Sequence, residues 1–448
     1  MSEDLIIEEI EEHREEYIEF LRSLIKTDSY NPPGNEKNVA LKIEEYLNEV
    51  GIKSEIFAFG ENRANLMTTL NNQFEGKTLL YNGHMDVVPS GSIEEWKYPP
   101  LSAIIKKKKI FGRGATDMKG GLAAMVIALK VLKKLDLELS GNLIIASVAD
   151  EETGGIFGTK WLLENKMTNI KCDFIIVGEP TGLKPLPKAI LLGEKGRVVI
   201  KIITNGISCH ASTPFIGKNA IYMMSDIIQN LDNLDEYIPK TEPPIHLSEL
   251  KDLLLDIFPN REILERILTD QPLLQHILKS LTSLTKSLTM INGGIKSNVI
   301  PDRCESLIDF RLLAGQNTEM LMNALEKLVN KLGYQVKNEP AGAPEEVFVY
   351  LEIISESEAS YWKNWRDSQT LKEFTEIVHK IYKKKPLYFL LPASADASFY
   401  RNSEFCQPTI IYGPGNASTA HAIDESIDIQ DFINSIKVYT IFAYNFLS

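Results

Sequence analysis

The chain of 448 residues has few cysteines, fewer basic than acidic residues and no long apolar run. Its four cysteines (Cys172, Cys209, Cys304 and Cys406) lack the paired spacing of a zinc finger or a disulfide scaffold, which favours a reducing compartment. The 61 acidic against 48 basic residues give a net charge of −13, which disfavours nucleic acid or an anionic membrane as the main partner. An acidic start is unlike a signal peptide, and no apolar run reaches the roughly 18 residues of a membrane span. We expect a cytoplasmic protein.

Several common catalytic patterns are also missing. The glycine-rich segment 112–121 has neither the G-x-G-x-x-G nor the G-x-x-x-x-G-K-[ST] spacing of a phosphate-binding loop. The G-x-S-x-G turn of serine hydrolases and the H-E-x-x-H pair of many zinc peptidases are absent as well. A nucleotide-binding protein is therefore a remote alternative, and serine chemistry is excluded.

Short apolar runs that end abruptly in polar residues indicate the fold. Four such runs are 78–83 before His84, 142–149 before Asp150, 174–178 before Glu179, and 409–413 on the way to His421. Helical patterns, such as that of 118–135, separate them. This alternation predicts an α/β fold with a mostly parallel sheet between helices. Ligands bind at the carboxyl ends of such strands, where the polar residues stand.

The middle of the chain has a different pattern. A half-exposed strand at 194–204 is followed by a helix, two further strands and another helix, which predicts an inserted α+β domain. We place the catalytic domain at 1–192 and 353–448, and the inserted domain at 193–352. The latter contains a leucine-rich amphipathic stretch, Ser248 to Leu288. Three interpretations of this stretch stay open: a dimer surface, a roof over the substrate pocket, or local packing.

Histidines and carboxylates at the strand ends are candidate metal ligands. Of seven histidines, three stand in polar clusters: His84, His210 and His421. The sequence Asp150-Glu151-Glu152 places three carboxylates after a buried strand, where they repel one another unless a cation or a hydrogen-bond network compensates them. Alternation along the chain lets one of Glu151 and Glu152 bind metal while the other acts as a free base.

The donor types favour a hydrolytic site with two Zn²⁺-type ions, because imidazole and carboxylate groups are present and cysteine is not. If Asp117 bridges, one ion has His84, Asp117 and Glu179, and the other has Asp117, Glu152 and His421. Each ion keeps an open position for a shared water. Taken alone, Asp117 could equally cap a helix. Asp86, two residues after His84, can accept a hydrogen bond from the second ring nitrogen of His84.

The order and spacing of these motifs resemble one family along nearly the whole chain. The motifs are Gly83-His84-Met85-Asp86, Gly112 to Gly121, Asp150-Glu151-Glu152, Gly178-Glu179-Pro180-Thr181, and His421 to Glu425. The family is that of acetylornithine deacetylase, succinyl-diaminopimelate desuccinylase, aminoacylase and carboxypeptidase G. The resemblance implies a zinc exopeptidase-like catalytic domain with two zinc (or cobalt) ions and a smaller lid that mediates dimerisation. It also implies Glu151 as the general base and a cis peptide bond after Asp117.

The resemblance assigns further residues around the substrate. It implies that His210 stabilises the oxyanion, often across a dimer, and that Asn298, Arg311, Ser394 and Asn416 contact the substrate. A surface histidine and a surface ion pair are the alternatives for His210 and Arg311. Desuccinylase-like members tend to carry arginine where this chain has Glu194, which weakens the case for a doubly acidic substrate.

These observations predict a metal-dependent hydrolase that cleaves the amide bond of N-acyl amino acids or short peptides with a free carboxylate. Metal-activated water attacks the carbonyl, and Glu151 accepts its proton. A dipeptidase or carboxypeptidase of the same family is the alternative, and an inactive binding protein on this fold is a remote one. The expected partners are a small substrate and a second copy of the chain, with neither nucleic acid nor membrane.

Overall fold

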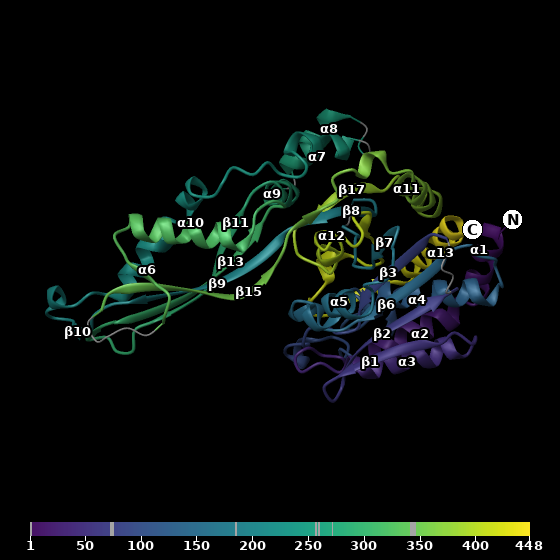
Figure 1. Cartoon of the computed structure of the whole chain (residues 1–448), viewed down its shortest axis with the longest axis horizontal. Helices are drawn as coiled ribbons and strands as arrows, with labels where there is room; N and C mark the ends of the chain where they lie inside the picture. Colours follow the sequence, from purple (N-terminus) through teal and green to yellow (C-terminus); the bar gives the residue numbers. More distant parts are fainter. Residues whose placement is uncertain are drawn as a thin grey trace.

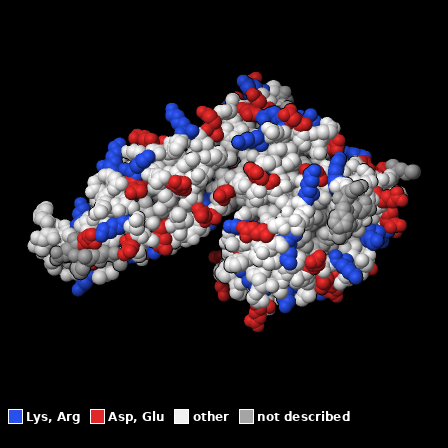
Figure 2. Space-filling view, in the orientation of Figure 1, with Lys and Arg blue, Asp and Glu red and all other residues white. Residues whose placement is uncertain are grey.

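The computed structural model describes residues 2–71, 76–183, 186–255, 258, 260–270, 272–340 and 346–448. It has an elongated shape with two lobes, one built on a nine-stranded sheet and the other on a five-stranded sheet (Figure 1). On the face drawn in Figure 2, acidic and basic side chains are interspersed over both lobes. Among the described residues, no helix is long and apolar enough to cross a membrane.

The nine-stranded sheet has the order β1-β2-β6-β3-β7-β18-β8-β16, with β17 paired to β8. The pairs β6/β3, β3/β7 and β7/β18 are parallel, so the centre of the sheet is parallel, as the four apolar runs predicted. The strands are β1 (Ser54–Phe59), β2 (Arg63–Leu70), β3 (Thr78–His84), β6 (Asn142–Val148), β7 (Phe174–Val177), β8 (Ala189–Glu194), β16 (Ser360–Tyr361), β17 (Leu387–Leu391) and β18 (Thr409–Ile411).

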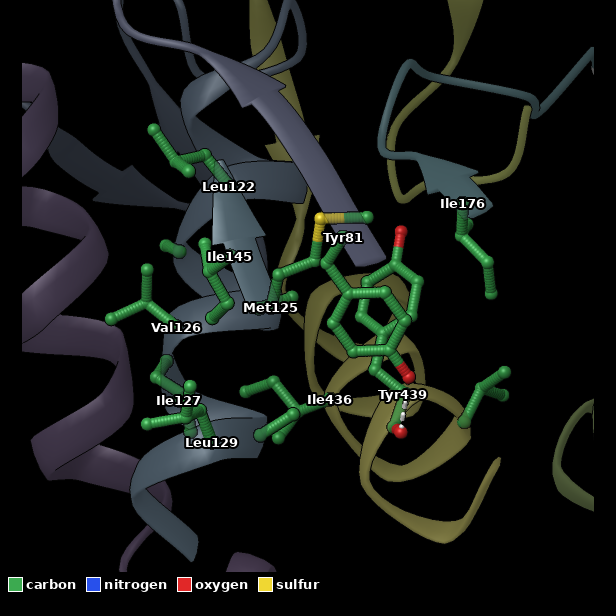
Figure 3. Close-up of a cluster of buried hydrophobic side chains, with 14 of the residues drawn as sticks. Tyr81, Leu122, Met125, Val126, Ile127, Leu129, Ile145, Ile176, Ile436 and Tyr439 are labelled. Atoms are coloured by element: carbon green, nitrogen blue, oxygen red, sulfur yellow. Dashed lines mark hydrogen bonds between the residues drawn. The ribbon is translucent and has the colours of Figure 1, made fainter. Parts of the chain in front are cut away.

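Helices from both ends of the chain cover one face of this sheet. They are α1 (Ser2–Glu12), α2 (Arg14–Lys26), α3 (Glu36–Asn48), α4 (Lys119–Lys134), α11 (Gln369–Tyr382) and α13 (Ile429–Leu447). Of these helices, α1 ends at Glu12 and α2 begins at Arg14, so the two meet at His13. Figure 3 shows how α4 and α13 pack on β3, where the Tyr81 hydroxyl donates a hydrogen bond of 2.7 Å to the carbonyl of Tyr439.

The opposite face of the sheet is covered by a second set of helices: α5 (Trp161–Asn165), α7 (Leu247–Leu255), α8 (Arg261–Asp270), α9 (Pro272–Leu281) and α12 (Ala397–Asn402). Leucines of α7, α8 and α9 are buried in one cluster with Leu191 of β8 and Phe389 of β17. The apolar side of the leucine-rich stretch thus packs on the larger sheet of its own chain. Its buried leucines are not a dimer surface, because the sheet already covers them.

The five-stranded sheet has the order β11-β13-β9-β15-β14, and α6 and α10 pack on one of its faces. Its elements are β9 (Gly196–Asn205), α6 (Ala220–Gln229), β11 (Thr285–Gly293), β13 (Arg303–Leu312), α10 (Thr318–Lys331), β14 (Val336–Lys337) and β15 (Phe348–Ser357). The chain leaves the larger sheet at Glu194 and pairs with it again at Ser360. The domain limits at 193 and 352 stay a prediction.

Two small sheets complete the architecture. At the outer end of the five-stranded sheet, β10 (Cys209–His210) pairs with β12 (Val299–Ile300) (Figure 1). Beside the larger sheet, β4 (Ile104–Lys106), β5 (Lys109–Phe111) and β19 (Ser426–Asp428) form an antiparallel sheet. The β19/β5 pairing brings the end of the His421–Glu425 motif next to the glycine-rich segment that holds Asp117.

Candidate metal centre and active site

The parallel strands bring the predicted ligands to one edge of the larger sheet. His84 is the last residue of β3, Glu151 and Glu152 follow β6, and Glu179 follows β7. These three strands are neighbours, so their carboxyl ends meet. Asp117 lies just before α4, and its peptide bond to Met118 is cis, as the family resemblance implied.

Contacts of both ring nitrogens orient the imidazole of His84. Nδ1 lies 2.9 Å from the carbonyl oxygen of Asp86 and 3.5 Å from its carboxylate. Because Nδ1 donates to that carbonyl, Nε2 is left to face Asp117 Oδ1 at 3.2 Å and Glu179 Oε1 at 3.4 Å. Burial lowers the pKa of His84, but these carboxylates outweigh it and raise the pKa well above its usual value.

Asp117 lies between two imidazoles. Its Oδ1 faces His84, while its Oδ2 lies 3.3 Å from Nε2 of His421, which is also 3.0 Å from Glu152 Oε2. Burial would raise the pKa of Asp117, but hydrogen bonds with the two histidines hold it below its usual range. Hydrogen bonds to Asp117 and Glu152 raise the pKa of His421 to about 10.

The remaining carboxylates are crowded and poorly hydrated. Burial raises the pKa of Glu151 well above its usual range, and burial likewise raises that of Glu179 to about 8. Ligand atoms lie within 4.8 Å of one another in two groups: His84, Asp117 and Glu152, and His84, Glu151 and Glu179. Buried carboxylates beside imidazoles, without a thiol, fit divalent cations that prefer nitrogen and oxygen ligands.

Asp86 connects His84, a predicted ligand, to the acidic loop. Its carboxylate is buried and accepts hydrogen bonds from the backbone nitrogens of Glu151 and Glu152, both at 3.2 Å. Asn31 donates to the same carboxylate at 2.8 Å. Asp86 therefore holds the loop that carries Glu151 and Glu152 as well as the ring of His84.

Glu425 has a similar supporting role, which the sequence did not reveal. Its Oε1 accepts hydrogen bonds from the backbone nitrogens of Thr116 (2.8 Å) and Asp117 (3.0 Å). Its Oε2 accepts from Arg113 at 2.7 Å. Only its place at the end of the His421–Glu425 motif hinted at this role, because its partners lie 308–312 residues away along the chain.

A cavity of about 1050 Å³ opens from the carboxylate cluster toward the junction of the two sheets. Asp117, Glu151 and His421 line its inner end. Two of the predicted substrate contacts line it as well: Arg311, at the inner end of β13, and Ser394. Arg197 and Asp396 also line it, although the sequence analysis did not select them.

The comparison with known proteins places this site in a family. The sequence profile of peptidase family M20/M25/M40 matches residues 80–445, which include all five predicted ligands. The chain belongs to this family. As a member of the M20 family, it is a metal-dependent hydrolase that acts on amide or peptide bonds.

Relatives within the M20 family span the whole chain. The chain is 26% identical over 431 residues to a "probable succinyl-diaminopimelate desuccinylase" of Staphylococcus aureus strain N315, covering 95% of this chain and 96% of the relative. It shares its fold with an M20 metallo-carboxypeptidase of Sulfolobus solfataricus (TM-score 0.75, 23% identity, 96% and 99% covered). It shares its fold equally with a di-peptidase of Saccharomyces cerevisiae (TM-score 0.76, 17% identity, 100% and 99% covered).

Three residues that the M20 resemblance assigned to the substrate do not line this cavity. His210 and Asn298 lie beside each other near the outer end of the five-stranded sheet, where the Ala211 nitrogen donates to the Asn298 carbonyl. The ten residues of β9 separate them from the cavity, which is about 30 Å of extended chain. Asn416 caps a short 3₁₀ turn through Ser418 and lines an adjoining cavity of about 360 Å³, which shares Gly182 and Leu183 with the larger one.

Proposed function

We propose that this enzyme hydrolyses the amide bond of N-acyl amino acids or short peptides with a free carboxylate, using two divalent cations. The observation that carries the proposal is the position of Asp117, with one carboxylate oxygen beside His84 and the other beside His421. His84, Asp117 and Glu179 would hold one ion, and Asp117, Glu152 and His421 the other. Nitrogen and oxygen donors favour Zn²⁺, with Co²⁺ as the alternative.

The proposed reaction divides the work between the ions and the chain. When bound, the cations polarise the scissile carbonyl and lower the pKa of water. Glu151 removes a proton from the attacking water as the oxygen adds to the carbonyl carbon. It then returns that proton to the amine nitrogen as the carbon–nitrogen bond breaks. Glu151 is placed for this task, because it lines the cavity beside the predicted ligands, with its Oε2 3.8 Å from Nε2 of His84.

The substrate carboxylate would bind at the junction of the two sheets. Arg311 lines the cavity there, opposite Arg197 in the register of β13 and β9. A guanidinium group holds a carboxylate through two parallel hydrogen bonds. An amide held in this way presents its carbonyl to the carboxylate cluster at the inner end of the cavity. This geometry suits deacylation, with dipeptidase or carboxypeptidase activity as the alternative.

A second copy of the chain would supply the oxyanion donor. His210 lies too far along the lid to reach the cluster of its own chain, and it is exposed. Apolar side chains are exposed in the same lobe, among them Phe215 (97%), Tyr222 (71%), Met290 (64%) and Ile295 (95%). Exposed apolar groups of this density mark interaction surfaces. We infer a symmetric homodimer through the lid, in which His210 and Asn298 of one copy serve the cavity of the other.

The cytoplasm is the proposed location. The four cysteines are free thiols, and Cys172, Cys304 and Cys406 are buried. Free buried thiols suit a reducing compartment.

A hydrolysis panel tests the proposed function. Purified protein reconstituted with Zn²⁺ or Co²⁺ is assayed on N-acetyl, N-formyl and N-succinyl amino acids and on dipeptides. Hydrolysis that depends on added metal supports the proposal, and the preferred group decides between deacylase and peptidase. Absence of hydrolysis with every member, in protein that has bound metal, would overturn it.

A further inference from the structure

One wall of the large cavity is apolar. It consists of side chains from the loop before β8, from β8 and β17, and from α9: Leu183, Leu191, Ile277, Leu387, Phe389 and Leu391. These residues come from three distant parts of the chain, and most belong to the core cluster on that face of the sheet or pack against it. The wall is therefore continuous with the core and presents apolar surface to whatever enters the cavity.

The α9 helix brings the leucine-rich stretch to this wall. Leu278 and Leu281 of α9 are buried in the core cluster, while Ile277 is half-buried and lines the cavity. Lys195, buried at the junction of the sheets, donates hydrogen bonds to the carbonyls of Ser280 (2.7 Å) and Ser283 (2.6 Å). These contacts fix the end of α9, so Ile277 is part of a preformed surface.

The charges at the other side of the cavity are nearly balanced. Among the described residues that line it, Arg197 and Arg311 are the two arginines, no lysine lines it, and His421 lies in the carboxylate cluster. Asp309 accepts a hydrogen bond from each, at 2.8 Å from Arg197 Nε and 2.7 Å from Arg311 Nε. Glu356 lines the same side. Asp309 directly compensates one of the two guanidinium charges, so this side of the cavity offers at most one positive charge to a substrate carboxylate.

Glu194 adds no cation to the cavity, although it stands where desuccinylase-like sequences tend to carry arginine. It is buried, lies 3.2 Å from Arg401 and accepts hydrogen bonds from Ser360 and from the Ala395 backbone. A second carboxylate of a substrate would thus lie against the apolar wall, away from the arginines that line the cavity. Burial of an unpaired carboxylate there is unfavourable.

We propose that the wall binds a bulky apolar group of the substrate, so that the enzyme selects amides with one carboxylate and one large apolar side chain or acyl chain. The volume of about 1050 Å³ exceeds what an acetyl group and a glycine need. Each substrate methylene that the wall removes from water makes the free energy of binding more favourable. This inference rests on the proposed function and names its substrate class.

The wild-type enzyme reconstituted with metal tests the inference on four substrates: N-acetylglycine, N-acetylleucine, N-octanoylglycine and N-succinylleucine. We expect kcat/KM to be at least tenfold higher for N-acetylleucine or N-octanoylglycine than for N-acetylglycine, and lower for N-succinylleucine than for N-acetylleucine. The preferred member shows on which side of the amide the apolar group binds. Equal or faster turnover of N-acetylglycine and N-succinylleucine overturns the inference and leaves the proposed function standing. Hydrolysis of none of the four, nor of any dipeptide, contradicts the proposed function itself.

A substitution in α9 tests whether the apolar wall causes this substrate preference. Ile277→Ser should lower kcat/KM for the preferred substrate by about tenfold while changing that for N-acetylglycine little. Ile263→Ser is the matched control, because Ile263 lies on α8 of the same segment and is 39% exposed. An equal loss on both substrates contradicts the role of Ile277.

Inhibition of the wild-type enzyme is a second test, which needs no variant. Octanoate must inhibit more strongly than acetate if the acyl chain binds at the wall, and leucine more strongly than glycine if the side chain binds there. If neither does, the inference fails.

Discussion

The carboxylate of Asp86 accepts a hydrogen bond of 3.2 Å from the backbone nitrogen of Glu151. The same residue holds His84, through its carbonyl at 2.9 Å and its carboxylate at 3.5 Å. One buried aspartate thus orients a proposed metal ligand and the proposed base together. A change at Asp86 should therefore alter metal affinity and catalysis at once.

Substitution of Asp86 is the first prediction. In Asp86→Asn, one carboxylate oxygen becomes an amide group that cannot accept hydrogen bonds from the acidic loop. We expect metal affinity to fall by roughly 10–100-fold, as for other residues that orient metal-binding histidines. Asp173→Asn is the control, because Asp173 accepts from Thr78 at the opposite end of β3. Metal titration followed by calorimetry measures both, and unchanged affinity in Asp86→Asn contradicts the role given to Asp86.

Glu151 and Glu152 should differ in function although they are adjacent. Glu151→Gln should keep the metal and the substrate affinity but lower kcat by ~10² or more, since it removes the proposed general base. Glu152→Gln weakens metal binding, because Glu152 lies beside His421. Metal content and steady-state kinetics of the two variants distinguish these roles. If Glu151→Gln loses metal and retains turnover, the two roles are exchanged.

Much of this site could be predicted from the sequence because its signals are local. Each apolar run ends at a polar residue, so the strand ends of β3, β6 and β7 could be located, and parallel pairing then brings their ligands together. The family motifs supplied the roles. The role of Asp86 could also be predicted from the sequence, because Asp86 stands two residues after His84.

Long-range packing could not be predicted from the sequence in the same way. The spacing of leucines in α7–α9 shows that these helices have an apolar side, but not that it packs on the larger sheet instead of a partner. Glu425 supports Asp117 through backbone nitrogens, which carry no sequence signal. The pairing of Arg197 with Arg311 depends on the register of β9 and β13. The distance of His210 from the cluster likewise depends on the length and direction of β9.

The stability of the protein should depend on pH through Lys195. Burial lowers the pKa of Lys195 to about 7, below its usual value near 10.5. Between these values the unfolded chain binds a proton that the folded chain does not, so the free energy of unfolding rises with pH, by at most about 1.4 kcal/mol per pH unit. Lys195→Met should lack this rise between pH 7 and 10. Lys279→Met, at an exposed position of α9, should keep it.

Denaturant unfolding of the three metal-free proteins at pH 7, 8 and 9 measures this difference. A curve for Lys195→Met that runs parallel to the wild-type curve contradicts the prediction. The three proteins share all other titratable groups, so a difference between their curves reports the substituted lysine.

Complementation between subunits tests the position of His210. His210→Ala should keep the fold and the metal while kcat falls by about 10²–10³, the usual loss for an oxyanion donor. Mixed dimers of His210→Ala and Glu151→Gln then regain one working site, formed by an intact metal centre and the partner's histidine. If subunits exchange and no activity returns, His210 does not act across the dimer. His246→Ala, a histidine away from β10 and the cluster, is the matched control and should leave kcat unchanged.

The number of metal ions bound by three variants tests the central claim most directly, because that claim is the bridge formed by Asp117 between two ions. After reconstitution with Zn²⁺ and dialysis, elemental analysis should find about two ions per chain in the wild type. His84→Ala and His421→Ala should each retain about one, since each histidine faces one side of Asp117. Asp117→Ala should lose both. One ion per chain in the wild type, or two in Asp117→Ala, would contradict the account.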